Sequence, residues 1–141
     1  MLERTHKANR ISTVFLLLVC VQALHSIEEY IGKLWENFPP ATWLTGLVSE
    51  DRHLGFLIIN VGLFIFGITA WYYLVRPDRM LAKIVIGFWL FIELVNGVGH
   101  PIWTIMQKRY TPGVITAPLL LITAIYLITL IYGGKAHSSR S

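Results

Sequence analysis

Long apolar runs separated by short polar segments dominate the pattern of this chain. Four runs are long enough to cross about 30 Å of hydrocarbon as helices, and they cover approximately residues 11–34, 53–75, 80–105 and 113–133. Each run is expected to be helical, because backbone polar groups in lipid need partners within the protein. The pattern predicts an all-α, polytopic membrane protein with about four transmembrane helices in one bundle, forming a single membrane domain over residues 1–141.

Composition supports a bilayer as the natural solvent and membrane lipids as the natural surroundings. Hydrophobic residues make up 55% of the 141 positions and charged residues 14%, and the mean hydropathy of +0.59 is outside the soluble range. The net charge of +4 comes from short basic clusters beside the apolar runs, where membrane orientation explains it. We therefore expect no nucleic-acid partner.

The distribution of basic residues predicts the orientation in the membrane. Eight lysines and arginines lie on the side of the termini and four on the other: Arg4, Lys7, Arg10, Arg76, Arg79, Lys83, Lys135 and Arg140 against Lys33, Arg52, Lys108 and Arg109. Cytoplasmic segments carry the excess of positive charge. The chain is expected to be an integral membrane protein with both termini in the cytoplasm.

Polar and ionisable residues within the apolar runs mark the candidate functional site. An ionised side chain at mid-bilayer costs roughly 2.5–3.5 kcal/mol on insertion scales, so such groups are rare and normally face a bundle interior. Six residues of this kind are candidates for catalysis: His25, Glu28, Glu29, Glu93, Asn96 and His100.

Helical spacing places these candidates on two polar stripes. His25, Glu28 and Glu29 occupy positions i, i+3 and i+4 of the first run, while the other set occupies i, i+3 and i+7 of the third. Both runs lead away from the cytoplasm, so the stripes lie at similar depth. We expect them to face one shared cavity.

The leading hypothesis is acid–base catalysis on a lipid-soluble substrate. Carboxyl and imidazole groups shielded from water can exchange protons near neutrality with an apolar molecule. Isomerisation, cyclisation and hydrolysis all fit, with Glu93 and Glu28 as proton donor and acceptor, the two histidines as partners and Asn96 as the orienting group. This mechanism requires no cofactor.

Other interpretations remain open at the level of sequence. Zinc or iron could be bound by His25, Glu28, Glu93 and His100, because two histidines and a carboxylate are a known catalytic set. A proton or cation transporter could use the same groups, and an assembly protein could use them to join helices. Glu29 could simply pair with Lys33, one turn later. The oligomeric state is undetermined.

The segment His25-Ser26-Ile27-Glu28-Glu29 reads HxxEE, and Asn96-Gly97-Val98-Gly99-His100 follows in a later apolar run. With four hydrophobic spans, the chain resembles the HXXEE family of small membrane proteins, which is largely uncharacterised. The resemblance covers most of the chain and implies a role for His25, Glu28 and Glu29.

A looser similarity is to emopamil-binding-type sterol isomerases, which also place His, Glu and Asn in a membrane cavity. Those enzymes move a double bond by proton transfer. By chemical analogy, this similarity implies an isoprenoid or sterol-like substrate.

Overall fold

The computed structural model describes residues 2–133, with side chains from residue 5 onward, and this part of the chain contains helices and no strand. The elements are α1 (Leu2–Ile31), α2 (Leu34–Asn37), α3 (Pro39–Gly46), α4 (Arg52–Ala70), the π-helical turn η1 (Trp71–Val75), α5 (Ala82–Gln107) and α6 (Ala117–Tyr132). Three stretches are long and apolar enough to cross a membrane, namely Thr5–Ile31, Arg52–Val75 and Ala82–Gln107, and α6 is a shorter apolar helix. The predicted all-α membrane protein is confirmed.

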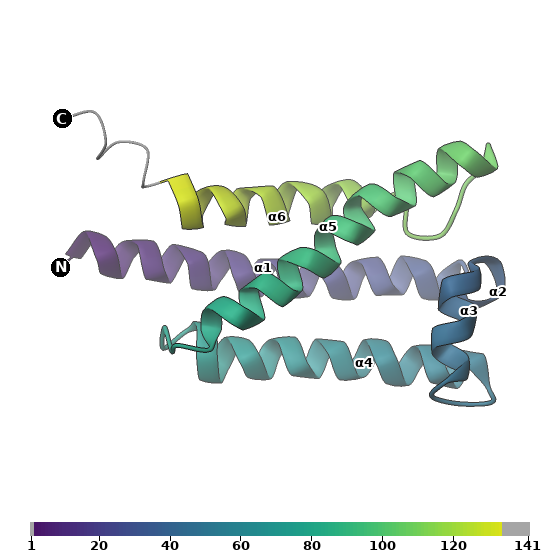
Figure 1. Ribbon diagram of the computed structural model, residues 1–141, viewed down its shortest axis with the longest axis horizontal. Helices are drawn as coiled ribbons and strands as arrows, with labels where there is room; N and C mark the ends of the chain where they lie inside the picture. Colours follow the sequence, from purple (N-terminus) through teal and green to yellow (C-terminus); the bar gives the residue numbers. More distant parts are fainter. Residues whose placement is uncertain (1, 134–141) are drawn as a thin grey trace.

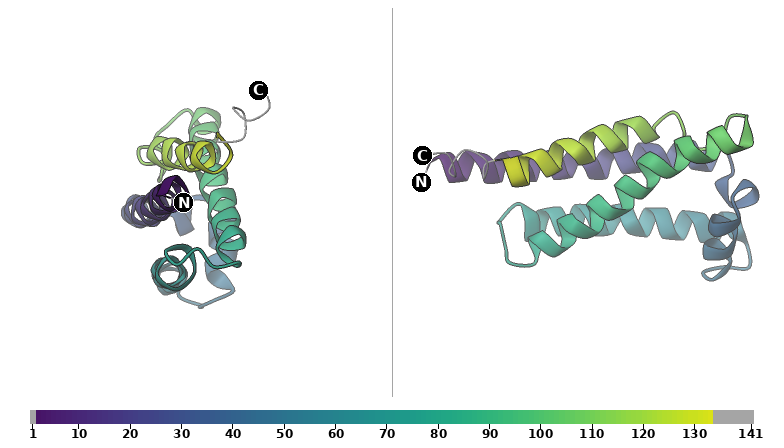
Figure 2. Two further views of the ribbon diagram at one scale, coloured as in Figure 1. Left: turned by 90° about the vertical axis from the view of Figure 1, so that its left-hand side faces the viewer. Right: turned by 45° about the horizontal axis from the view of Figure 1, so that its top comes forward.

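The helices form a bundle in which α1 lies between α6 and α4 (Figures 1 and 2). Helix α5 crosses these three obliquely (Figure 1). It starts beside η1, at the end of the bundle where α1 also starts, and it packs against α6 toward the opposite end. We call these the N-terminal end and the α3 end. Helices α1 and α5 both run from the N-terminal end toward the α3 end, as the sequence predicts.

Two helix boundaries differ from those expected. Helix α1 begins well before residue 11, because its polar first turns extend the helix beyond the apolar run, and it ends at Ile31 because Lys33 takes a left-handed conformation with φ 50°. Helix α6 begins at Ala117 and not at 113, because Gly113 has φ +93° and turns the chain before the helix. Part of the fourth predicted span is therefore a loop.

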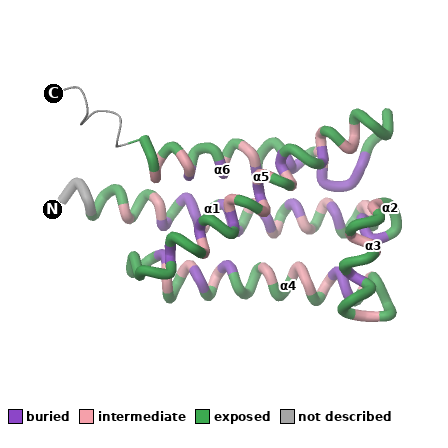
Figure 3. Tube along the Cα trace, viewed as in Figure 1, coloured by how far each residue is buried: buried purple, intermediate pink, exposed green. Residues whose placement is uncertain are grey.

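An apolar core fills the half of the bundle toward the N-terminal end. Phe15 and Leu18 of α1, Trp89 of α5 and Leu127 of α6 have no exposed surface, and the rings of Phe15 and Trp89 meet edge to face. Exposed positions alternate with buried ones along each long helix (Figure 3). Large apolar side chains on the outside, such as Phe91, suit contact with lipid.

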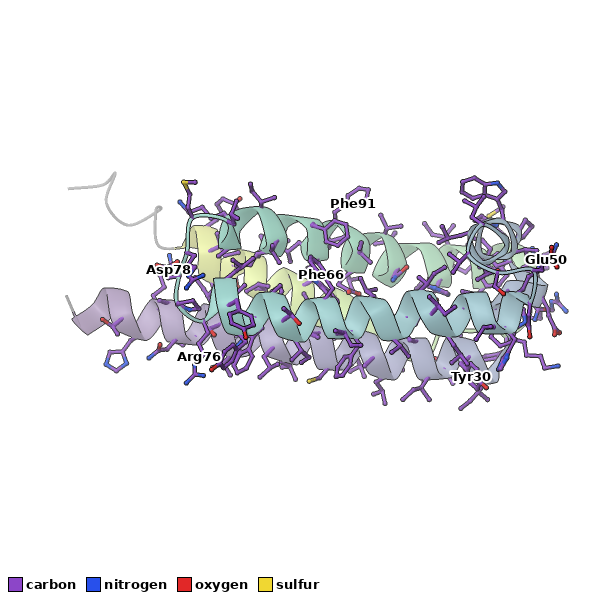
Figure 4. The ribbon with its side chains drawn as sticks, turned by 90° about the horizontal axis from the view of Figure 1, so that it is seen from below. Tyr30, Glu50, Phe66, Arg76, Asp78 and Phe91 are labelled. Atoms are coloured by element: carbon purple, nitrogen blue, oxygen red, sulfur yellow. The ribbon has the colours of Figure 1, made fainter. Side chains whose placement is uncertain are left out.

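The two ends of the bundle carry different side chains. Arg76 and Asp78 lie at the N-terminal end, Tyr30 and Glu50 lie at the α3 end, and Phe66 lies between them (Figure 4). At the α3 end, α2 and α3 pack on the start of α4, while Trp43 and Leu44 of α3 and Leu47 directly after it expose large apolar side chains. Such a face suits the interfacial layer of a membrane.

Candidate functional site

The polar stripes of α1 and α5 lie in matching register. On α1, Gln22 precedes Glu29 by seven residues, and on α5, Glu93 precedes His100 by seven. Because both helices run in the same direction, Gln22 faces Glu93 and Glu29 faces His100. The stripes thus meet at two levels, separated by roughly 10 Å along the helix axes at 1.5 Å per residue.

At the level nearer the α3 end, His25, Glu29 and His100 form what we call the His–Glu–His cluster. Oε1 of Glu29 lies 3.4 Å from Nε2 of His25 and 3.1 Å from Nε2 of His100. The two imidazole rings meet edge to face, with centroids 4.7 Å apart and planes at 83°. The exposed fractions of the three residues are 0%, 6% and 7%, so the cluster is shielded from solvent.

Glu28, the neighbouring carboxylate of the motif, faces a different partner. Its oxygens accept hydrogen bonds from the Tyr110 hydroxyl at 2.9 Å, the Ile115 amide at 3.1 Å, and the amide and hydroxyl of Thr116 at 2.8 and 2.6 Å. Three of the four donors belong to Ile115 and Thr116, which directly precede α6, where a negative charge interacts favourably with the helix dipole. Glu28 of α1 therefore binds the turn that leads into α6.

Thr116 connects the two carboxylates of the motif. Its Oγ1 lies 2.7 Å from Nδ1 of His25 and 2.6 Å from Oε2 of Glu28. On the other side of the same imidazole, Nε2 faces Glu29. Glu28, Thr116, His25 and Glu29 thus form one continuous polar chain.

A loop between α5 and α6, residues 108–116, closes the cluster, and we call it the covering loop. A Cβ atom placed at Gly113 would lie 2.5 Å from Cε1 of His100 and 2.8 Å from Cε1 of His25. At the end of α1, a Cβ atom at Gly32 would lie 2.6 Å from Pro112. The backbone of this loop therefore approaches both histidines more closely than a side chain would permit.

Tyr110 is an exposed residue of the covering loop whose side chain is hydrogen-bonded to the site. Partial burial, and then the hydrogen bond to Glu28, raise the pKa of Tyr110 to about 12. Its phenol therefore remains protonated near neutral pH and donates its proton to the carboxylate.

At the second level, Glu93 is buried among neutral polar groups. With the Gln22 amide nitrogen directed toward α5, Gln22 donates to Glu93 at 2.7 and 3.2 Å and accepts from Ser26 at 3.2 Å. Oγ of Ser26 also lies 2.7 Å from Oδ1 of Asn60, so its single hydroxyl proton can serve either the Gln22 or the Asn60 oxygen. This network links α5, α1 and α4 around a carboxyl group with no exposed surface.

One expectation about individual residues is corrected by the structure. Glu29 does not pair with Lys33, because α1 ends at Ile31 and Lys33 pairs with Glu36 at 3.5 Å. The metal set expected from the sequence, with Glu28 and Glu93, stays a prediction, and Glu29 is the carboxylate that faces both histidines.

A small pocket adjoins the covering loop. It has a volume of about 170 Å³ and is lined by Gly32, Asn37, Trp103, Arg109, Tyr110, Thr111 and Pro112. A larger apolar pocket of about 450 Å³ opens between α4 and α5, with Leu63, Phe66 and Phe88 among its lining residues. The first could admit a polar group and the second an apolar chain.

Comparison with known proteins places the motif in a wider context. A family described as "Protein of unknown function with HXXEE motif" matches residues 16–127. "Uncharacterized protein YrkK" of Bacillus subtilis (strain 168) is 30% identical over 99 residues, which are 69% of this chain and 60% of the relative. The chain thus matches about 60% of that relative's length. No solved structure matches it.

Proposed function

This chain belongs to the HXXEE family, whose function is not established, and we propose that it is a membrane-embedded enzyme performing acid–base chemistry on a lipid-soluble substrate. The reaction class is isomerisation, cyclisation or hydrolysis. An isoprenoid or sterol-like molecule is the substrate class that suits an apolar bundle with a few convergent polar groups.

The observation that supports this proposal best is the environment of Glu93. Its carboxyl group is fully buried, and within the described residues it forms no ion pair with a lysine or arginine. Its partner is the neutral amide of Gln22. Such a group is costly for stability, and a proton-transfer role accounts for its presence.

We assign the remaining catalytic roles to the polar residues around Glu93. In the proposed mechanism Glu93 exchanges a proton with the substrate, while the second proton is received or returned at the position of the His–Glu–His cluster. Glu28 is already engaged by four donors, so we assign it the orientation of His25 through Thr116 and not the proton transfer expected from sequence. Gln22 positions the Glu93 carboxyl group, and Asn96 keeps the orienting role that the sequence suggests.

A transport function is less well supported by the packing. A transported proton or cation needs a polar route to both sides of the membrane. Here Phe15, Leu18, Trp89 and Leu127 fill the bundle between the Glu93 level and the N-terminal end. This apolar core favours a site that communicates with one side.

Isotope incorporation tests the enzymatic proposal even while the substrate is unidentified. Purified protein is incubated with a total lipid extract in D₂O or H₂¹⁸O, and the lipids are analysed by mass spectrometry. Isomerisation or cyclisation transfers solvent deuterium to carbon, and hydrolysis introduces ¹⁸O. We expect a labelled lipid with the wild type and none with Glu93→Gln.

The Gln variant keeps the size of the side chain, and equal circular dichroism spectra and elution profiles would show that it folds. His53→Ala is a matched control because His53 lies at the exposed end of α4, bonded to Tyr30. Absence of any labelled lipid across extracts from several membranes would refute the proposal, as would equal labelling by Glu93→Gln.

We also propose that both termini are cytoplasmic. Lys7, Arg10, Arg76, Arg79 and Lys83 gather toward the N-terminal end, in keeping with the positive-inside rule; Lys135 and Arg140 lie outside the described residues. Cys20 is the single cysteine of the sequence, so it is first replaced by alanine. In this background, the Ser49→Cys variant should react with an impermeant maleimide added to intact cells. The Asp78→Cys variant should react only after lysis, and the reverse pattern would invert the proposed orientation.

A further inference from the structure

We infer that His25, Glu29 and His100 bind one divalent transition-metal ion. The inference goes beyond the proposed catalysis, because a bound ion could be structural or catalytic. The three ligand atoms, two imidazole nitrogens and a carboxylate oxygen, all lie within 4.8 Å of one another and belong to buried residues. These are ligands that zinc and iron(II) accept.

The positions of the protons around His25 provide the first argument. Glu28 accepts four hydrogen bonds, as an ionised carboxylate does, so the single hydroxyl proton of Thr116 points to Oε2 of Glu28 at 2.6 Å. Thr116 must then accept from Nδ1 of His25, 2.7 Å away. A neutral His25 therefore carries its lone pair on Nε2.

This lone pair faces another acceptor. Nε2 of His25 lies 3.4 Å from Oε1 of Glu29, and it has no hydrogen-bond partner. A second proton on His25 would be expected to form a well-directed bond to the carboxylate, which the geometry does not show. A metal ion between the two atoms satisfies both, since each then donates a lone pair to the same cation.

The distances between the ligand atoms agree with a shared ion. Two ligands bound about 2.0–2.1 Å from a tetrahedral zinc ion stand roughly 3.3–3.4 Å apart. The carboxylate oxygen of Glu29 lies 3.4 Å and 3.1 Å from the two imidazole nitrogens. Two of the three ligand pairs therefore already have a spacing close to that around a shared ion, while the two imidazole nitrogens lie within 4.8 Å of each other.

Charge also favours a cation at this position. Glu29 is 6% exposed, and in the described part of the chain its ion pairs are with histidines alone. A divalent ion compensates this charge and lowers the cost of placing the carboxylate within a membrane bundle. Three protein ligands leave a fourth position open for water or substrate.

The surrounding residues resemble the outer shell of a metal site. A ligating histidine usually donates its second N–H to a carboxylate or another acceptor, which fixes the ring and the tautomer. Here His25 donates from Nδ1 to Thr116, and Thr116 donates to Glu28. The HxxEE motif is thereby explained: its histidine and second glutamate bind the ion, and its first glutamate orients the histidine.

Metal content and metal titration test this inference on the full-length protein in detergent. Protein purified without chelators is analysed by plasma mass spectrometry, then stripped and titrated with Zn²⁺, anaerobic Fe²⁺ or Co²⁺. We expect about one ion per chain, and a visible Co²⁺ spectrum that zinc abolishes. The comparison between zinc and iron identifies which of the two the site prefers.

Variants locate the ion. His25→Ala, His100→Ala and Glu29→Gln should each lose stoichiometric metal, while the matched His53→Ala variant retains it. Thr116→Val keeps the shape of the side chain and removes the hydroxyl, so the ion should still bind but roughly 10–100-fold more weakly. This intermediate effect is not expected from a merely structural threonine.

Two results would overturn the inference. One is a wild type that binds none of the three ions in titration; the other is metal binding that survives in both histidine variants. If the variants aggregate, X-ray absorption of the zinc-loaded wild type decides instead. Two imidazoles in the shell support the assignment, and a shell containing the Cys20 thiolate or water alone contradicts it. Since no substrate is involved, failure of the isotope assay leaves this result unaffected.

Discussion

Replacing Gly113 by alanine tests whether the covering loop holds the two histidines together. The added methyl group would lie 2.5 Å from Cε1 of His100 and 2.8 Å from Cε1 of His25, so at least one ring must move. The backbone also has φ +93°, a conformation that alanine rarely adopts.

The two costs can be estimated separately. A non-glycine residue in such a conformation costs about 1–3 kcal/mol, and overfilling a packed site costs typically 1–3 kcal/mol more. The free energy of unfolding of Gly113→Ala should therefore fall by roughly 2–6 kcal/mol relative to the wild type. Its thermal transition in detergent should shift to lower temperature, and any metal bound at the cluster should bind more weakly.

Gly99→Ala is the matched control, because Gly99 adjoins His100 in sequence but a Cβ atom there meets nothing within 4 Å. It lies inside α5, where alanine is intrinsically more favourable than glycine by about 1 kcal/mol. Unfolding in increasing dodecyl sulfate, followed by circular dichroism, compares both variants with the wild type. If Gly113→Ala unfolded within about 0.5 kcal/mol of the wild type, the close approach of loop and histidines would be refuted.

Two further predictions concern the contacts around the site. Gly97→Ala should destabilise the α5–α6 contact by about 1–3 kcal/mol, because the new Cβ lies 2.9 Å from Cβ and 3.1 Å from the backbone of Leu121. Gly87→Ala is the control, because the space around Gly87 is open. Equal thermal transitions of the two variants would contradict this packing. Ultraviolet titration should show one tyrosine ionising near pH 12 in the wild type, and because Tyr110 loses its carboxylate partner in Glu28→Gln, its pKa should fall there. An unchanged titration curve in that variant would show that the hydrogen bond is not formed.

The fold could be predicted from the sequence because its main signal is local. Each apolar run is long enough to need a helix, and a bilayer permits few alternatives. The depth of the polar stripes followed from the directions of the first and third helices, and His25 and His100 do meet in the structure. Even Gln22, which the sequence analysis did not single out, shares the stripe: it precedes His25 by three positions.

The different partners of Glu28 and Glu29 could not be predicted in the same way. Successive residues on a helix point about 100° apart, so both lie on the flanks of the direction that His25 takes. Which flank faces α5 and which faces α6 depends on how the bundle is assembled. The structure turns Glu29 toward α5 and Glu28 toward α6.

The role of the covering loop also could not be predicted from the periodicity of the sequence. Tyr110 and Gly113 belong to a segment without helical spacing, and the sequence placed part of it inside the fourth span. Its path is determined by contacts with residues far away in the chain, such as the one between Pro112 and Gly32. Local pattern carries no information about contacts of this kind.

The short length of α6 has a consequence for the surrounding bilayer. Its 16 residues rise only about 24 Å, several ångströms less than the thickness of a typical hydrocarbon core. Next to α6, either the bilayer becomes thinner locally or the covering loop and its polar atoms lie at the level of the acyl chains. The mismatch falls on the side of the bundle where Glu28 meets α6. Membrane thickness, and hence acyl-chain length, would therefore act directly on the geometry of the buried site.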